Sequence, residues 1–469
     1  MADCCTNAEG QNDIVEKTEN QTDGCRLGLP FAEYAQVPNV AVQERMSGMK
    51  ETHSHETSPR VLLFSPFFFP EPISTGKANT HLVEALAAHG AETTVVCSHP
   101  LYPDWVPVRS TTSLSGVTIL RGGAWMRYSK HVSLRRVALE AWFAVYAAYT
   151  VLRARHLRSH TDVVIGVFPP SLFALGTHLL LPRYVRRIAV IHDLQGVLAG
   201  QRESAVRRMI TRLIHAVESR VFRQQDLCIF FSADMAKEAQ QSYGLDASHV
   251  AVQYPFVTID NGRASSIEHA DRLEGILPTG KIHVVYSGAL GLKQNSEQFV
   301  ALLHAAAKRF PDVQFHVFSG GPIFERLRLR YQGVPEAEVH FHPLVEERDL
   351  EELYRRSAIQ MIPQAEKTEA GALPSKLPNL LAAGVFIFAI TSPESEVARL
   401  LEEAGTGMLV EQWREALFLQ RLKEALCKAQ GEPSAARRQQ VQPLLARFTV
   451  DNLVNLVFGT AQPEPRGNA

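Results

Sequence analysis

The sequence predicts an α/β fold built from two Rossmann-like, doubly wound domains that face one another across a cleft. A chain of 469 residues is too long for one ordinary hydrophobic core. From residue 60 onward, short apolar runs alternate with helical patterns, which is typical of parallel sheets covered on both faces. A polar stretch with turn signals interrupts this alternation at about residues 260–280, and the same pattern starts again after it.

These observations divide the chain into four segments. Residues 1–59 are polar and predict a disordered tail. Residues 60–275 and 276–445 are expected to form the two Rossmann-like domains. Residues 446–469 are expected to form a helix that returns to the first domain, followed by a short tail.

The first half reads as a strand, loop, helix and strand that is then extended by further strands. We expect a first strand in the apolar run VLLFSPFFFP that follows Arg60, and further strands at 93–98, 117–120, 163–167, 188–191 and 227–231. A helix is expected at 78–89 that stops at Gly90. In the second half we expect strands at 282–287, 313–319, 339–342, 359–362 and 385–390, and helices at 297–309, 322–331, 350–357 and 377–383. Ligands of such sheets bind at the carboxyl ends of the strands.

Composition excludes several classes of protein. With 45% hydrophobic and 21% charged residues the chain is globular, and a net charge of -1 provides no general attraction to nucleic acid. The six cysteines have no metal-ligand or redox spacing, and the N-terminus has no signal segment, so we expect a cytoplasmic protein with reduced thiols.

One apolar stretch, residues 137–152, is too short to span a bilayer. Arginines flank it on both sides. We favour a buried helix with solvated ends; a helix lying in a membrane interface is the alternative.

The strongest local signal follows the first strand of the second half. There, the run SGALGLK contains Ser287, Gly288, Gly291 and Lys293 and leads into a helix. Glycines let the backbone approach an anion, helix N-termini supply free N–H groups, and lysine adds a point charge. A diphosphate suits this loop, although a plain strand-to-helix connection has the same pattern.

Further turns lie at the same predicted edge. Gly320 and Gly321 end the next strand, and Pro343 and Leu344 end the one after it, where they could contact a base and ribose or simply form tight turns. A small-residue loop then precedes an apolar helix and places Ser375 near its N-cap. This loop provides the candidate residues Gly371, Ala372, Leu373, Pro374, Ser375, Lys376 and Asn379.

The run GALPSKLPNLLAAG resembles the donor-sugar loop of family 4 glycosyltransferases, in particular the branch of the colanic-acid fucosyltransferase and O-antigen amino-sugar transferases. The runs FFFPEPISTGKANTHLVEALAAHGAETTVV, PLYPDW and YSGALGLKQ are similar to other motifs of that branch. The resemblance extends over residues 60–410. It implies the two-domain GT-B fold, with an acceptor-binding first domain, a nucleotide-sugar-binding second domain and retention at the anomeric carbon.

The family commonly carries two glutamates around this loop. Their positions fall here at Gly371 and Asn379, so the sugar contacts are the weakest part of the resemblance. Lys376 becomes a second candidate, beside Lys293, for neutralising the departing phosphate. Because the sequence has no Asp-x-Asp motif and no His and carboxylate cluster with ligand spacing, we expect transfer without a metal or other cofactor.

The first half offers candidates at the same catalytic edge. Gly76 and Lys77 follow the first strand and could approach the donor phosphate or the acceptor, unless Lys77 is a solvated surface residue. His192 and Asp193 end a predicted strand and could orient the acceptor hydroxyl. A packed histidine and a helix-capping aspartate are equally compatible with the pattern.

The acceptor side is indicated by charge and by the family. A basic patch could face anionic lipid or a polyprenyl diphosphate, or could be ordinary helix surface. It contains Arg127, Lys130, His131, Arg135, Arg136, Arg183, Arg186 and Arg187. The resemblance implies a nucleotide sugar donor, a lipid-linked glycan acceptor in surface polysaccharide biosynthesis, and peripheral attachment at the inner face of the membrane.

Two other functions fit the same sequence. A nucleotide-sugar epimerase or hydrolase would use similar phosphate loops. A two-domain sugar-binding protein that has lost catalytic ability would be consistent with the missing glutamates.

Overall fold

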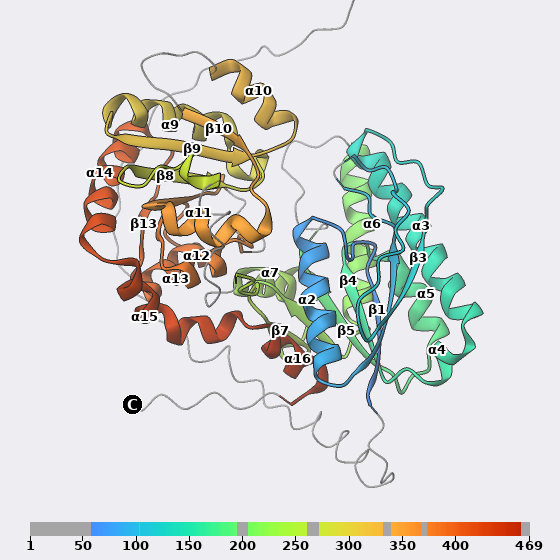
Figure 1. Ribbon diagram of the computed structural model, residues 1–469. Coiled ribbons are helices and arrows are strands. Elements are labelled where there is room, and N and C mark those ends of the chain that lie inside the picture. The colour runs from blue at the N-terminus through green and yellow to red at the C-terminus, as the bar shows by residue number, and fades with distance from the viewer. Residues whose placement is uncertain are drawn as a thin grey trace, which may run out of the picture. The chain divides into compact units, whose positions relative to one another are not determined.

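The computed structural model describes residues 58–102, 104–194, 205–259, 272–331, 339–366 and 373–460. Within these ranges the chain forms two parallel sheets, each covered by helices (Figure 1). The predicted α/β fold with two Rossmann-like domains is confirmed. The predicted tail lies outside the described residues as far as residue 57.

The first sheet has seven parallel strands in the order β3-β2-β1-β4-β5-β6-β7. Its central strands are almost wholly apolar, as burial on both faces requires. In chain order they are β1 (Arg60–Phe64), β2 (Glu92–Ser98), β3 (Val117–Gly122), β4 (Val163–Phe168), β5 (Arg186–Ile191), β6 (Leu227–Phe230) and β7 (Val250–Val252).

The helices of the first domain connect these strands. They are α2 (Ser74–Ala88), α3 (Val132–Arg153), α4 (Arg155–Ser159), α5 (Leu172–Leu180), α6 (Ala205–Phe222) and α7 (Ala233–Tyr243). Helix α7 shows why such a segment is helical: Ser232 Oγ accepts a hydrogen bond from Met235 N–H at its start, and Gly244 ends it with a φ of 62°. Helices α3 and α5 pack side by side (Figure 1).

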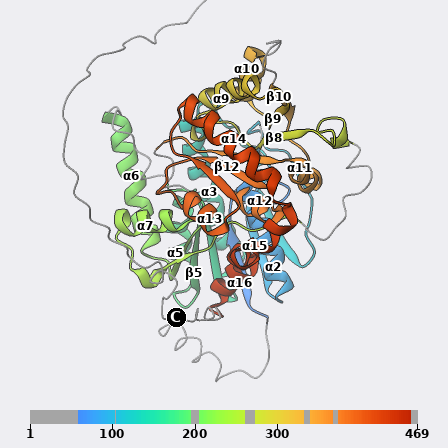
Figure 2. The ribbon, with the colours of Figure 1, turned by 90° about the vertical axis from the view of Figure 1, so that its left-hand side faces the viewer.

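The second sheet has six parallel strands in the order β10-β9-β8-β11-β12-β13. They are β8 (Ile282–Ser287), β9 (Val313–Ser319), β10 (Val339–Pro343), β11 (Ile359–Pro363), β12 (Phe386–Ile390) and β13 (Gly407–Val410). The longer helices here are α9 (Ser296–Arg309), α10 (Pro322–Tyr331), α13 (Glu396–Ala404), α14 (Glu415–Gly431) and α15 (Ser434–Leu445). Helix α14 packs across this sheet (Figure 2), and the short α11 (Leu350–Arg356) and α12 (Leu377–Ala383) complete the domain.

The last helix, α16 (Val450–Phe458), belongs to the first hydrophobic core although it ends the described chain. Its residues Leu453, Val454 and Val457 are buried in that core, and the helix packs beside α2 (Figure 1). The Arg186 guanidinium donates to the carbonyls of Val457 at 2.9 Å and Leu456 at 3.2 Å. Because an arginine at a helix C-terminus satisfies carbonyls that lack an intrahelical partner, this contact anchors α16 to β5.

Both sheets reverse direction beside their first strand. The order of the second sheet places β11, and not β9, on the far side of β8, so the loops after β8 and β11 lie beside each other at the carboxyl edge. In the first sheet the loops after β1 and β4 are related in the same way. These reversals are the positions where open α/β sheets bind ligands.

Candidate active site

The loop after β8 leads into α9 and carries free backbone donors. The Gly288 N–H is already used, because it donates to Phe318 O at 3.0 Å, and its φ of 144° favours glycine. The N–H groups of Ala289, Leu290 and Gly291 have no acceptor within the described residues. Three such donors in one loop suit an anionic ligand, so diphosphate binding by this loop stays a prediction that rests on these amides and not on that of Gly288.

Lys293 lies in the 3-10 turn η3 (Leu292–Gln294) that follows this loop. Its Nζ atom is 3.3 Å from Oδ2 of Asp193, which follows β5 in the first domain. The structure therefore places in contact two residues that we predicted as catalytic from different halves of the chain. The Lys293 side chain is 56% exposed. Such an ion pair contributes about 0–1 kcal/mol, so a diphosphate can replace the carboxylate.

Lys376 lies immediately before α12 and reaches the ends of two strands. Its Nζ atom donates to Met361 O at 2.6 Å and to Ser287 O at 3.2 Å, and it lies 4.2 Å from the centroid of the Tyr286 ring. Within the described chain it has no carboxylate partner. Burial of the ammonium group lowers the pKa of Lys376 to about 7.

The two loops predicted to hold one diphosphate are joined directly. Ala365, after β11, donates its N–H to Lys293 O at 2.8 Å. Together with the Lys376 contact to Ser287, this bond connects the β8 loop to the turn before α12. The physical cause is the strand order, which makes β8 and β11 neighbours.

The donor-sugar loop differs from prediction in three positions. Leu373 is 6% exposed and packs in the core, so it does not present its side chain to a ligand. Ser375 is exposed and makes no capping bond, because the helix begins at Leu377, as expected, and Lys376 occupies the N-cap position. Pro374 forms the turn itself, its carbonyl accepting from Leu377 N–H at 2.9 Å. Gly371 and Ala372 lie outside the described residues.

Asn379 has a different role from the one predicted. Its Oδ1 atom accepts from Thr258 N–H at 2.7 Å, and its Nδ2 atom donates to Thr258 Oγ1 at 2.9 Å. Residue 258 lies in the chain that leaves the first domain. The amide is therefore occupied in tethering that segment to α12, and its contacts do not support donor binding.

The glycine and proline turns lie at the expected sheet edge. Gly320 and Gly321 follow β9, are exposed, and have open space beside them. Pro343 ends β10, and the Leu344 side chain that follows is 55% exposed. These turns leave the second sheet accessible beside the β8 loop.

Gly76 and Lys77 lie in the first two turns of α2, not in the loop before it. A Cβ atom at position 76 would be 2.8 Å from Glu71 O, so glycine is needed there for packing. The Lys77 Nζ atom is 2.9 Å from Glu347 Oε2, in the turn after β10. Lys77 is thus paired with the second domain, and its approach to the donor phosphate or the acceptor stays a prediction.

His192 directly follows β5 and is a packed neutral ring. It lies 4.4 Å from the Phe231 ring centroid, its Nε2 atom is buried without a hydrogen-bond partner, and burial lowers the pKa of His192 to about 4. At neutral pH the ring carries no charge, and it can donate one hydrogen bond and accept another.

The prediction missed Glu71, a buried carboxylate in the loop after β1. It accepts from Leu101 N–H at 2.8 Å and from Tyr102 N–H at 2.7 Å, and burial raises the pKa of its carboxyl group. These bonds hold the loop after β2 against the loop after β1. The available signal was a lone acidic residue between prolines in the run FFFPEP.

Beside this loop lies an aromatic cluster. Trp105 makes edge contacts with Phe67 and Tyr128, and the Arg135 guanidinium lies 4.0 Å from the Trp105 ring centroid. Trp105 of the PLYPDW run thus belongs to an aromatic cluster with a cation at one side. Such surfaces bind sugar rings or the apolar part of a lipid.

Two arginines of the predicted basic patch are structural. Arg186 holds α16, and the Arg187 guanidinium donates to the carbonyls of Val185, Leu181 and Pro182. Both are therefore unavailable to an acceptor. Arg127, Lys130, His131, Arg136 and Arg183 remain exposed.

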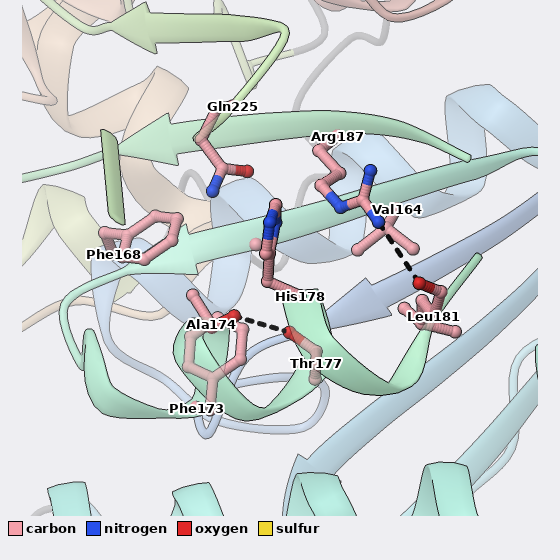
Figure 3. Close-up of a pocket in the computed structure, with 10 residues that line it drawn as sticks. Val164, Phe168, Phe173, Ala174, Thr177, His178, Leu181, Arg187 and Gln225 are labelled. Atoms are coloured by element: carbon pink, nitrogen blue, oxygen red, sulfur yellow. Dashed lines mark hydrogen bonds between the residues drawn. The ribbon is translucent and has the colours of Figure 1, made fainter. Parts of the chain in front are cut away.

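An enclosed cavity in the first domain is too small to be the substrate site. Figure 3 shows it between β4, β5 and α5, lined by Phe168, Phe173, His178 and Arg187 among others. Its volume of about 10 Å³ is the least that one water molecule needs. It lies inside the core, away from the carboxyl edge.

The described ranges hold no group of three His, Cys, Asp or Glu side chains placed to bind a metal ion. They also hold no helix that is both long and apolar enough to cross a bilayer.

Comparison with known proteins agrees with this geometry. The profile of Glycosyltransferase Family 4 matches residues 76–261, and that of Glycosyl transferases group 1 matches residues 281–428. A protein of Escherichia coli K12 named as a colanic acid biosynthesis glycosyl transferase, WcaI, is 26% identical over 362 residues, covering 73% of this chain and 86% of its own length.

Solved structures show the same fold at low identity. The sucrose-phosphate synthase of Thermosynechococcus elongatus has a TM-score of 0.62 at 15% identity, with 86% of this chain and 100% of that chain covered. WaaG, a glycosyltransferase involved in lipopolysaccharide biosynthesis, has a TM-score of 0.62 at 13% identity, with 85% and 100% covered. The two domain matches, the two parallel sheets and the joined loops after β8 and β11 together show that the chain belongs to glycosyltransferase family 4 and is a GT-B glycosyltransferase.

Proposed function

We propose that this glycosyltransferase moves a sugar, with retention and without a metal ion, from a nucleotide diphosphate sugar to a lipid-linked glycan acceptor in surface polysaccharide biosynthesis. The observation that carries the proposal is the joined pair of loops after β8 and β11. They gather three free N–H groups and the ammonium groups of Lys293 and Lys376 at one edge of the second sheet.

The donor half of the proposal rests on charge. When the anomeric bond breaks, negative charge grows on the leaving diphosphate, and donors that already point at that charge stabilise the transition state. Lys293 and Lys376 supply cations, and the amides from Ala289 to Gly291 supply hydrogen bonds. These groups would take the place of the cation used by metal-dependent transferases.

The exchange of partners at Lys293 links donor binding to the acceptor side. A bound diphosphate would replace Asp193 at the Lys293 ammonium group, which leaves the Asp193 carboxylate free. Asp193 belongs to the first domain and follows β5. Its free carboxylate would then orient the acceptor hydroxyl or accept the proton of that hydroxyl. The neutral ring of His192 lies next to it.

The acceptor class is supported by the relatives and by the first domain. The E. coli protein is named for colanic acid biosynthesis and WaaG for lipopolysaccharide biosynthesis. The aromatic cluster around Trp105 and the exposed basic residues near the start of α3 suit a glycan carried on a lipid phosphate. We place the enzyme in the cytoplasm, attached to the inner face of the membrane.

The test is transfer of labelled sugar to extracted lipid-linked acceptors, with and without EDTA. A panel of nucleotide sugars in a thermal-shift measurement first identifies the donor, because ligand binding raises the unfolding midpoint. We expect Lys293→Ala to lower kcat/KM about 100-fold or more, as the loss of one charge-stabilising donor does elsewhere. Lys308→Ala, an exposed lysine at the end of α9, is the matched control and should leave the rate unchanged.

Each alternative has its own outcome. Undiminished transfer by Lys293→Ala contradicts the role of this lysine. Rapid release of nucleotide without any acceptor favours a hydrolase or epimerase. Binding of the nucleotide sugar with no turnover under any acceptor would indicate a sugar-binding protein.

A further inference from the structure

Helix α3 has an apolar stripe on the face that its domain does not cover. The opposite face packs in the core through Leu139, Trp142, Phe143, Ala147 and Val151. The stripe consists of large side chains that are 52% to 70% exposed: Leu134, Val137, Val145, Tyr149 and Leu152. With 22 residues the helix is about 33 Å long, and the stripe runs along most of it. The favoured prediction of a buried helix for residues 137–152 is therefore right for the face that packs in the core and wrong for the face that carries the stripe.

The stripe carries no charge because the one acidic residue of α3 turns inward. The Glu140 carboxylate accepts from Ser171 N–H at 2.8 Å and from Leu172 N–H at 3.0 Å, at the start of α5. A carboxylate at a helix N-terminus satisfies donors that otherwise lack partners. Between Arg136 and Arg153, the solvent face of α3 is wholly uncharged.

The exposed apolar surface continues onto the neighbouring helix. Helix α5, which packs beside α3 (Figure 1), leaves Leu179 84% exposed, and Tyr184 in the following turn is 69% exposed. In the loop before α3, Trp125 is 75% exposed. Monomeric soluble proteins rarely expose so many large apolar side chains together, so these side chains are expected to contact a partner or a membrane.

Both ends of the stripe are basic. Lys130 and Arg136 lie at its beginning, and Arg153, Arg155 and Arg183 lie at its other end. All five are exposed, and none makes an ion pair with any described residue. We call the stripe of α3, with Leu179 and these five cations, the α3 face.

This distribution of charge identifies the occupant. If two copies of the α3 face packed together, either in parallel or antiparallel, the basic residues at the ends of one copy would lie against the basic residues of the other. Like charges would then repel at both ends of the contact. An anionic bilayer instead neutralises both ends while the headgroup region takes up the apolar side chains between them. We infer that the α3 face is the surface by which the protein lies on membranes that contain anionic lipid.

The inference deepens the proposed function, on which it rests for the idea of a membrane-borne acceptor. Helix α3 begins at the carboxyl edge of the first sheet, after β3, and Arg135 in its first turn stacks on the Trp105 cluster. A bilayer along α3 would therefore lie next to the acceptor side. The headgroup of a lipid-linked glycan could reach the site without leaving the membrane.

The test is flotation of the purified full chain with vesicles of phosphatidylcholine alone or with about 30% phosphatidylglycerol, whose negative surface potential attracts basic segments. We expect binding to the anionic vesicles only, weakened roughly tenfold or more by Val145→Glu and by the pair Arg153→Glu and Arg155→Glu. The matched control is Leu329→Glu on α10, a leucine that is likewise 63% exposed, which should bind as the wild type does. Unchanged thermal midpoints show that each variant is folded, and Tyr149→Ser is a milder second change at the stripe.

Several results would overturn the inference. If Val145→Glu binds vesicles as well as the wild type does, the α3 face is not the membrane contact. If the wild type binds neutral and anionic vesicles equally, the basic ends of the face do not contribute to binding. A dimer in light scattering that Val145→Glu dissociates would assign the face to a second copy. The proposed function is judged separately, by donor binding in the thermal-shift panel, which Val145→Glu should leave unchanged.

Discussion

Burial lowers the pKa of Lys376 towards neutral pH, so its charge can respond to a bound leaving group. Its ammonium group contacts two carbonyls and an aromatic ring, all of which favour the charged form, yet removal from water dominates and brings its pKa to about 7. A diphosphate placed beside it would favour the protonated form again. The residue therefore gains most of its charge when the donor binds.

We predict that kcat/KM for the donor falls as pH rises above about 7, approaching tenfold per pH unit, because this constant reports ionisation in the free enzyme. Lys376→Arg keeps the charge and should remove this dependence, whereas Lys376→Met should lower the rate at every pH. The measurement is initial rate at low donor concentration from pH 6 to 9. A flat profile for the wild type would contradict the role of Lys376.

The ion pair between Lys293 and Asp193 should affect both donor binding and the rate of transfer. Asp193→Asn removes the carboxylate that competes with the diphosphate, so donor affinity should rise by up to about fivefold, the value of an exposed ion pair. The same change should lower kcat if Asp193 handles the acceptor hydroxyl. Calorimetry and steady-state rates separate the two effects, with Glu297→Gln on α9 as the control. Weaker donor binding in Asp193→Asn would show that the pair positions Lys293 and does not compete with the donor.

At the scale of elements, two helices from different domains cap each other. The Glu396 carboxylate, at the start of α13, accepts from Ala233 N–H at 2.8 Å and from Asp234 N–H at 3.2 Å at the start of α7. In return, Asp234 Oδ2 accepts from Glu396 N–H at 3.1 Å. Each helix supplies the other with the anion that its N-terminus favours, so this contact connects the two domains.

We predict that Glu396→Ala lowers the free energy of unfolding by about 1–3 kcal/mol, because it leaves two partly buried N–H groups without an acceptor. Glu402→Ala, an exposed position on the same helix, should change it by less than about 0.5 kcal/mol. Urea denaturation followed by fluorescence measures both. Equal stability of the two variants would mean that water replaces the carboxylate at no cost.

At the scale of the whole molecule, a row of histidines crosses the second sheet. His283 Nε2 lies 3.0 Å from Pro278 O, His283 Nδ1 lies 3.1 Å from His316 Nε2, and His316 Nδ1 lies 3.1 Å from His342 Nε2. A carbonyl can only accept, so His283 donates to Pro278, and each following ring donates to the one before it. Burial lowers the pKa of His316 to about 2 and that of His342 to about 4, so the row is neutral.

Acid should therefore destabilise the fold. The folded-state pKa of His316 lies below the unfolded value of about 6.5, so the unfolded chain binds more protons. Stability is full above pH 6.5 and is lost progressively as pH falls from there towards the folded pKa. At pH 5 the loss for His316 is about 2 kcal/mol.

The unfolding midpoint should fall accordingly between pH 7.5 and pH 5. His316→Gln should lower stability at pH 7.5 but reduce this dependence on pH. The control is His249→Gln, an exposed histidine outside the row. A wild-type midpoint that does not change over this interval would refute the argument.

The sequence by itself determined the fold class and most strands, because buried parallel strands are apolar runs with turns at both ends. Strands β4 and β8 were expected within one or two residues of their observed bounds, and β1 was expected in the apolar run where it lies. The edge strands β7 and β13 were not expected, since three or four residues at the edge of a sheet carry little periodic signal. The roles of Leu373, Asn379 and Gly76 were also beyond the sequence, because each depends on a neighbour that is distant in the chain or hidden in the packing.

Only the tertiary structure decided which candidate residues meet. Lys293 and Asp193 are 100 positions apart and follow strands of different sheets. Each lies at the carboxyl edge of its own sheet, and only the packing of the two domains brings the two side chains into contact. The same holds for α3, whose composition was compatible with a buried or an interfacial helix. Which side of a helix is covered depends on the element packed against it, and here α5 and the first sheet cover one side and leave the other exposed.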